Sequence, residues 1–251
     1  MRRLVAVLMA LLFSFSLLVT DSDALVASAV RLPVNTIKQL ARLGKTSGSK
    51  ELGANLIRLS EKLPEAQRLA FLEQAYVDIL VRQGRLSARK ADEVIKNLSG
   101  TPGFRSALSK MSGISEAKAS GHGFEVLAAN ALKKNGYKIL AIGQRFDDGI
   151  KNAMTDIDLI AKKGSRTCIF ELKNYHPQSI DYNALINFRG DMQSLNAYAG
   201  KHANVRSFFV ISSRPVDNNI DKLLRAAAKS QNVELLYADV DTLPMLLEVL
   251  K

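Results

Sequence analysis

Apolar residues recur at spacings of three and four through residues 30–115, a period that is typical of amphipathic helices. Ser87 stands where an N-cap side chain would accept a hydrogen bond from a first-turn amide. The pattern predicts helices over residues 35–43, 51–63, 64–83 and 87–98 and a short one over 104–111, with breaks at Gly44, Gly84 and Gly100. We therefore expect an all-helical N-terminal region.

The pattern changes after residue 115. A helical stretch over 115–134 ends at Asn135-Gly136, where glycine tolerates the left-handed conformation that stops a helix. The segments that follow predict strands over 137–144, 155–161 and 167–173, a helix over 182–199, a strand over 207–212, a helix over 219–229, a strand over 233–238 and a helix over 243–250. This order predicts an α/β fold, with a mixed sheet flanked by helices.

Residues 101–113 separate the two patterns. Pro102, Gly103 and Gly113 lie there among scattered serines, so we expect a hinge. The predicted organisation is thus an N-terminal segment over 1–29, a helical region over 30–115 and an α/β domain over 116–251.

The first 29 residues have the pattern of an export signal. Arg2 and Arg3 precede an almost unbroken apolar run over 4–19, and Ala29 and Ala24 each end a candidate cleavage site. The run is at the short end for a membrane-spanning helix, which needs about 20 apolar residues. We expect a cleaved signal peptide and an exported protein, periplasmic or secreted, with an uncleaved membrane anchor as the alternative.

The net charge of the chain indicates which class of molecule it is suited to bind. The chain of 251 residues is 47% hydrophobic and carries a net charge of +11, which favours nucleic acid or an anionic membrane surface. Removing residues 1–29 takes away two basic and two acidic residues, so this charge belongs to the mature protein. Cys168 is the single cysteine, so an intramolecular disulfide is excluded, and in its apolar strand we expect it to pack as a small hydrophobe.

Candidate chemistry lies in two predicted strands joined by a short turn. Strand alternation places Asp156 and Asp158 on one face of the first strand, and Glu171 and Lys173 on one face of the second. Antiparallel pairing would bring cross-strand neighbours to about 5 Å. The surrounding residues are apolar, and buried charges must either pair or bind a metal. The alternatives are a plain salt bridge on a solvated face and a metal site.

Paired carboxylates suit Mg²⁺ or Mn²⁺, which take oxygen ligands from carboxylates, water and phosphate. A bound cation of this kind acidifies a water molecule and stabilises charge on a phosphate. Lys173 could orient or deprotonate the attacking water, or neutralise the developing charge.

The segments TDIDLIA (residues 155–161) and IFELKN (residues 169–174) resemble the core of the PD-(D/E)XK, or restriction-endonuclease-like, nucleases. They are most similar to the branch that contains archaeal Holliday-junction resolvases and Mrr-type restriction enzymes. The resemblance covers roughly residues 116–240 and implies a restriction-endonuclease-like fold. Asp158, Glu171 and Lys173 match the motif, and Glu125 matches a glutamate in the helix before the first strand. The implied catalytic set is these four residues, with the three acids as metal ligands.

The match has one departure and some weaker elements. Ile157 replaces the proline of the family's name, which leaves Asp156 and Asp158 as alternative ligands, although the Asp-Leu-Ile context favours Asp158. Many members carry a glutamine on the following helix, and Gln193 matches it. His122 and His176 are further candidate contacts to the substrate. Two alternatives stay open for a further set of basic residues, a phosphate-tracking surface or ordinary solvated loops: Lys133, Lys134, Lys138, Lys162, Lys163, Arg166 and Arg189.

The resemblance implies a Mg²⁺-dependent endonuclease that hydrolyses phosphodiester bonds. DNA is expected over RNA because this branch mostly cuts DNA. Together with the export signal it indicates a secreted or toxin-like nuclease, whose helical region binds a neutralising or delivery protein, and a homodimer is a further expectation. The alternative is a non-catalytic module for nucleic acid or protein on a degenerate nuclease fold.

Overall fold

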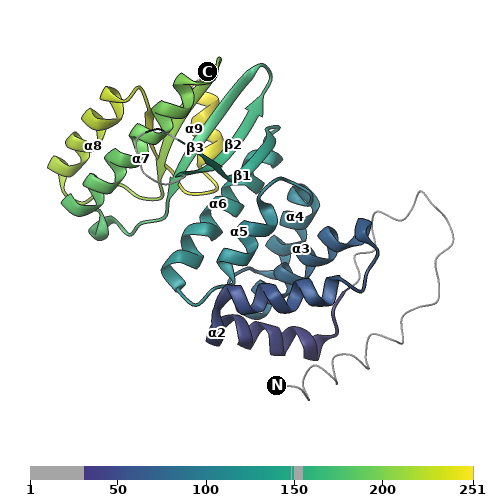
Figure 1. Cartoon of the computed structure of the whole chain (residues 1–251). Helices are drawn as coiled ribbons and strands as arrows, with labels where there is room; N and C mark the ends of the chain where they lie inside the picture. The colour runs from purple at the N-terminus through teal and green to yellow at the C-terminus, as the bar shows by residue number, and fades with distance from the viewer. Residues whose placement is uncertain (1–30, 148, 150–154, 251) are drawn as a thin grey trace.

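The computed structural model describes residues 31–147, 149 and 155–250, so the expected export signal lies outside the described residues. Figure 1 shows the arrangement of the helices and strands. The helical region consists of α2 (Val34–Ser60), α3 (Glu65–Arg82), α4 (Ala88–Leu98) and α5 (Phe104–Met111). None of the helices in these ranges is long and apolar enough to cross a membrane.

Five strands form one mixed sheet in the order β1-β2-β3-β4-β5. The strands are β1 (Lys138–Phe146), β2 (Thr155–Lys163), β3 (Arg166–Lys173), β4 (Val205–Ile211) and β5 (Glu234–Tyr237). The first three pair antiparallel, whereas β4 runs parallel to β3 and β5 runs parallel to β4. Parallel neighbours need crossover connections, which α7 (Tyr182–Gly200) and α8 (Asn218–Ser230) supply. The predicted α/β fold with a mixed, helix-flanked sheet is confirmed.

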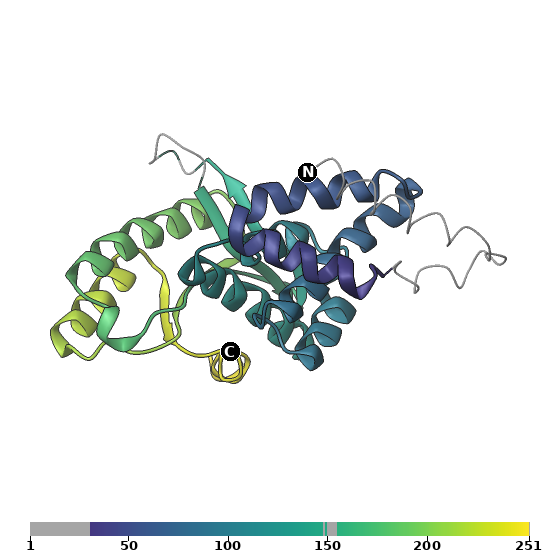
Figure 2. The same ribbon diagram turned by 90° about the horizontal axis from the view of Figure 1, so that it is seen from below.

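Helices cover both faces of the sheet. On one face, Phe188 of α7 and Leu224 of α8 pack with Ile169 and Phe209 of the strands. On the other, α6 (Glu116–Lys134) and α9 (Leu243–Val249) bury Leu132 and Leu247 against the sheet. Figures 1 and 2 show α7 and α8 on the side of the sheet away from the helical region.

The helical region shares its core with the sheet. Leu80 of α3, Leu108 of α5 and Phe170 of β3 are completely buried members of a single apolar cluster. Residues 101–113, where a hinge is expected, are attached to β1, because the amide of Ile142 donates to the carbonyl of Pro102 at 2.9 Å; the hinge itself stays a prediction. The neighbouring Gly103 allows the two backbones to approach closely.

The break predicted at Gly44 lies elsewhere. Gly44 is helical and buried, and a Cβ there would come within 3.0 Å of Leu52 and of the carbonyl of Ser112. The kink in α2 occurs at Gly48, where φ is +87°. Two glycines four residues apart therefore have different roles: one allows close packing and the other allows a conformation that side chains disfavour.

Other local features agree with the sequence pattern. The Ser87 side chain caps α4 by accepting from the amide of Lys90. Gly136 follows α6 with φ at +82°. Cys168 is free and buried in β3, as expected for a small apolar residue.

Gly103 offers a direct test of the contact between the helical region and β1. Its φ is +82°, and an added Cβ would lie 1.7 Å from the carbonyl oxygen of Ile142. Gly84 has a similar φ of +76° but nothing within 4 Å, so it is a matched control. Gly84→Ala should lower the free energy of unfolding by about 1–2 kcal/mol, the cost of a left-handed alanine. Gly103→Ala should cost about 1–3 kcal/mol more, because the backbones must separate.

Urea denaturation of the two variants beside the unmodified chain measures this difference. Equal losses for Gly103→Ala and Gly84→Ala would show that the contact with Ile142 contributes nothing to stability.

Candidate active site

The β2–β3 ladder stops where the candidate chemistry begins. Its pairing runs from Lys163 opposite Arg166 to Leu159 opposite Phe170, while β2 continues against β1 as far as Thr155. Where β2 leaves β3, the side chain of Asp158 accepts a hydrogen bond from the amide of Leu172 at 2.8 Å. The carboxylate thus takes the place of the backbone carbonyl that would accept this hydrogen bond in a continuous ladder. The main chain of β3 thereby fixes the position of the Asp158 side chain.

Lys173 lies between two acids. Its Nζ is 2.6 Å from Oε1 of Glu171 on the same face of β3, and 2.9 Å from Oδ2 of Asp191 on α7. Glu171 is 8% exposed, so this ion pair is shielded from water. Lys173 is therefore held from its own strand and from the helix packed over it.

Helix α6 brings the third acid to the same end of the sheet. Glu125 is buried, and its Oε1 is 2.7 Å from Nδ1 of His122, one turn earlier. The side chain of Asn174, directly after β3, donates to Oγ of Ser120 at 2.7 Å and ties α6 to the strand. The candidate set of Glu125, Asp158, Glu171 and Lys173 is thus gathered from α6, β2 and β3.

Burial and mutual repulsion shift the ionisation of this group. Burial raises the pKa of Asp158 well above its usual range, and the charges of Glu171 and Glu125 raise it further. Burial raises the pKa of Glu171 to about 7, although the Lys173 ammonium opposes the shift. Burial lowers the pKa of Lys173, but the charges of Glu171, Asp158 and Asp191 outweigh it, so the pKa lies above its usual value. The lysine is therefore a cation at neutral pH.

The acids fit a divalent cation by their chemistry. Mg²⁺ and Mn²⁺ prefer oxygen ligands, and Asp158, Glu171 and Glu125 supply only carboxylates. The pKa values of Asp158 and Glu171 are raised by burial first and by neighbouring carboxylates second, and a bound cation would favour their charged forms. Among the described residues, however, no three His, Cys, Asp or Glu side chains are arranged to hold a metal ion together. Each acid is instead engaged by one donor or partner, Leu172, Lys173 or His122.

Asp156 lies outside this cluster. Its Oδ2 is 3.5 Å from Nζ of Lys110, and its Oδ1 is 3.4 Å from Nε of Arg145. It faces Arg145 across the β1–β2 ladder. Of the two alternative aspartates, the structure therefore brings Asp158 to the candidate site.

Two weaker candidates are not brought into the cluster. Gln193 is exposed on α7, and on a helix it points about 200° away from Asp191, two residues earlier. His176 is exposed at the start of the short helix η2 (Pro177–Ser179), where its Nδ1 accepts from the amide of Gln178. Contacts of these residues with a substrate stay predictions.

Asp191 is the member of the site that sequence reasoning did not find. An acid within a helix resembles an ordinary solvent-facing residue, and nothing local points to its partner. Only the packing of α7 on the sheet brings it to Lys173. A weak indication is its position near the middle of the helix that follows the Glu-x-Lys strand.

Comparison with known proteins identifies the family of one part of the chain. The family model Mrr_cat, described as restriction endonuclease, matches residues 116–240, which contain all four candidate residues. No curated protein matches the chain. The chain is similar to the solved structure of protein VC1899 from Vibrio cholerae at 16% identity and a TM-score of 0.32, covering 86% of this chain and 55% of that one. Through residues 116–240 the chain belongs to the Mrr-type restriction endonuclease family of PD-(D/E)XK nucleases.

Proposed function

We propose that this protein is a metal-dependent endonuclease that hydrolyses phosphodiester bonds, with DNA as its main substrate. One observation carries the proposal: Asp158, Glu171 and Lys173 meet where β2 separates from β3, with Glu125 at the same end of the sheet. The family supports nuclease activity and a nucleic-acid substrate. The preference for DNA rests on the branch that the motif resembles.

Glu125, Asp158 and Glu171 are the residues that would hold Mg²⁺ or Mn²⁺. When bound, the cation would supply positive charge that stabilises the phosphate and lowers the pKa of a water molecule. The amide of Leu172 orients Asp158, and His122 orients Glu125. Lys173 contacts Oε1 of Glu171, so Oε2 could face the cation, whose charge would also relieve the repulsion among the acids.

Lys173 acts in this proposal as a fixed cation. Its raised pKa keeps the ammonium protonated at neutral pH, so it serves as a hydrogen-bond donor to the reacting phosphate or to the attacking water. Proton abstraction by this group is disfavoured for the same reason. Asp191 holds the ammonium in place from the α7 side.

We further propose that the protein is exported and acts outside the cytoplasm, in the manner of a secreted or toxin-like nuclease. This rests on the sequence of residues 1–29 alone. A neutralising or delivery protein and a homodimer stay predictions. A degenerate, non-catalytic fold finds no support in the cluster, because each acid and the lysine of the motif is present.

Substitution of the motif tests the proposal. Glu171→Ala and Lys173→Ala should each lower plasmid nicking by at least about 100-fold in Mg²⁺ or Mn²⁺, the size of effect expected when a preorganised charge is removed. The measurement is the rate of conversion of supercoiled plasmid by the purified protein.

Asp156→Asn is the matched control, since this acid lies on the same strand but pairs with Lys110 and Arg145 outside the cluster. It should change the nicking rate by no more than about 3-fold, because a surface ion pair contributes little to stability or geometry. Undiminished activity of Glu171→Ala and Lys173→Ala would remove these residues from the active site.

The pKa of Glu171 predicts how stability varies with pH. Because this pKa is raised from 4.5 to about 7 in the folded protein, the folded state holds more protons than the unfolded state between these values. The free energy of unfolding should therefore fall as the pH rises from about 4.5 to 7 in the absence of divalent metal. Glu171→Gln should show a shallower decline, because its amide does not titrate.

Urea denaturation at several pH values, with a chelator present, provides this comparison. Adding Mn²⁺ at pH 8 should stabilise the unmodified chain more than Glu171→Gln, since ligand binding to the folded state adds to stability. Parallel pH curves for the two proteins would contradict the assigned ionisation of Glu171.

Asp191→Asn tests how Lys173 is positioned. With one of its two anchors neutralised, the lysine should be less well oriented, and kcat should fall by about 10-fold or more while KM for DNA stays within about 2-fold. Asp191→Glu should recover part of kcat because it restores the charge. A rise in KM with unchanged kcat would assign Asp191 to substrate binding instead.

A further inference from the structure

The excess positive charge of the protein lies mainly outside the domain that carries the motif. Residues 30–115 contain 15 basic and 7 acidic residues, a net charge of +8. Residues 116–251 contain 18 basic and 15 acidic residues, a net charge of +3. The strongest attraction for an anionic partner is therefore expected on the helical region.

Some of these basic side chains line one concave surface, which we call the basic pocket. It has a volume of about 210 Å³, and its lining includes Lys38, Arg42, Lys45 and Arg82, with Ala41 and Gln83 as the other lining residues. Three of the cations follow each other at spacings of four and three on one face of α2. Among the described residues, none of the four forms a salt bridge with an acid. Four cations without a salt bridge around a hollow are suited to an anion.

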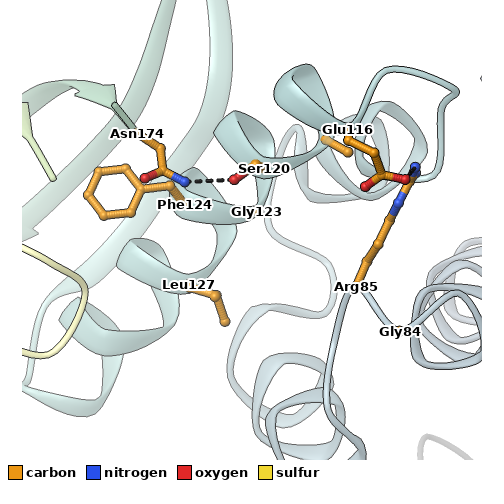
Figure 3. Close-up of a pocket in the computed structure, with 9 residues that line it drawn as sticks. Gly84, Arg85, Glu116, Ser120, Gly123, Phe124, Leu127 and Asn174 are labelled. Atoms are coloured by element: carbon orange, nitrogen blue, oxygen red, sulfur yellow. Dashed lines mark hydrogen bonds and ion pairs between the residues drawn. The ribbon is translucent and has the colours of Figure 1, made fainter. Parts of the chain in front are cut away.

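A second pocket lies beside α6, between the end of β3 and the turn after α3. Figure 3 shows Asn174, bonded to Ser120, on one side of it and Arg85 with Glu116 on the other. Its volume is about 320 Å³. Asn174 directly follows Lys173, so this pocket begins next to the catalytic strand.

The turn after α3 connects the two pockets. Arg82 and Gln83 line the basic pocket, and the next two residues, Gly84 and Arg85, line the second. The buried Arg85 side chain holds this turn by donating to the carbonyls of Met111 and Gly113 and to Glu116.

The pKa of Glu116 also indicates that the two pockets lie close together. Arg85 lowers its pKa by hydrogen bonding, and the charge of Lys45 on α2 lowers it further. Lys45 of the basic pocket is therefore close enough to Glu116, which lines the second pocket, for their charges to interact.

We propose that the helical region is a substrate-binding arm, in which the basic pocket binds the sugar-phosphate backbone of the nucleic acid that enters the active site. This rests on the proposed nuclease function and gives the helical region a role in it. Lys38 and Lys45 are separated by about 10 Å along α2, a length over which a nucleic acid presents several phosphates. A concave pocket lined by cations favours a nucleic-acid strand over a flat anionic membrane.

The test compares two triple variants of the full chain with the same change in charge. The pocket variant is Lys38→Gln, Arg42→Gln and Lys45→Gln, at positions where glutamine preserves helix propensity. The control variant is Arg58→Gln, Arg89→Gln and Lys96→Gln, three exposed residues of the helical region that line neither pocket.

Binding of a fluorescent DNA duplex is measured by anisotropy in EDTA at several salt concentrations, with circular dichroism to confirm folding. The pocket variant should bind at least about 10-fold more weakly, and the slope of log affinity against log salt should shrink by about 2–3, close to 0.9 for each phosphate that is no longer neutralised. The control variant should stay close to the unmodified chain. In Mg²⁺, the pocket variant should show a raised KM for DNA with kcat unchanged.

Two results would overturn the proposal. One is equal DNA affinity of the pocket variant and the control variant. The other is unchanged DNA affinity of the pocket variant together with abolished binding to phosphatidylserine vesicles, which would assign the surface to a membrane.

The proposed nuclease function can fail independently of the arm. DNA binding that depends on the pocket, without cleavage in Mg²⁺ or Mn²⁺, would refute the nuclease function and leave the binding arm supported. Cleavage with pocket-independent binding would refute only the arm.

Discussion

The candidate site depends on holding several carboxylates close together where water has little access. Burial raises the pKa of Asp158 and of Glu171, and the charge of Glu125 raises both further. Such a group is tolerated only where each charge has a partner. The partners are the amide of Leu172 and the ammonium of Lys173, with His122 beside Glu125. The separation of β2 from β3 creates this opportunity, because it leaves an amide without a backbone acceptor.

The two helix layers and the helical region hold the charged groups of the site and their partners in position. One helix layer places Asp191 against Lys173, and the opposite layer places Glu125 near the strands. The helical region is packed into the same apolar cluster as the sheet, so it keeps a fixed position relative to the catalytic end. A rigidly attached basic arm can direct a long polyanion toward the site, which a loosely tethered one could not do as well.

The sequence predicted the parts of the site that local periodicity determines. Alternation placed Glu171 and Lys173 on one face of β3, and the motif resemblance added Glu125. Alternation alone could not separate Asp156 from Asp158, because the two share a face in a regular strand; the end of the ladder at Leu159 distinguishes them. Asp191 was beyond reach because its role arises from tertiary packing. The expected hinge stays a prediction, since the sequence does not distinguish a glycine that permits close contact, as Gly103 does, from one that permits motion.

The central claim is that the cluster is a cation site that works with Lys173. Crystals of the protein grown with Mn²⁺ would test it most directly, by locating the metal from its anomalous scattering. The account predicts one strong peak among the carboxylates of Glu125, Asp158 and Glu171, with Nζ of Lys173 still against Asp191. No peak at saturating Mn²⁺, or a peak only at carboxylates outside the cluster, would contradict it.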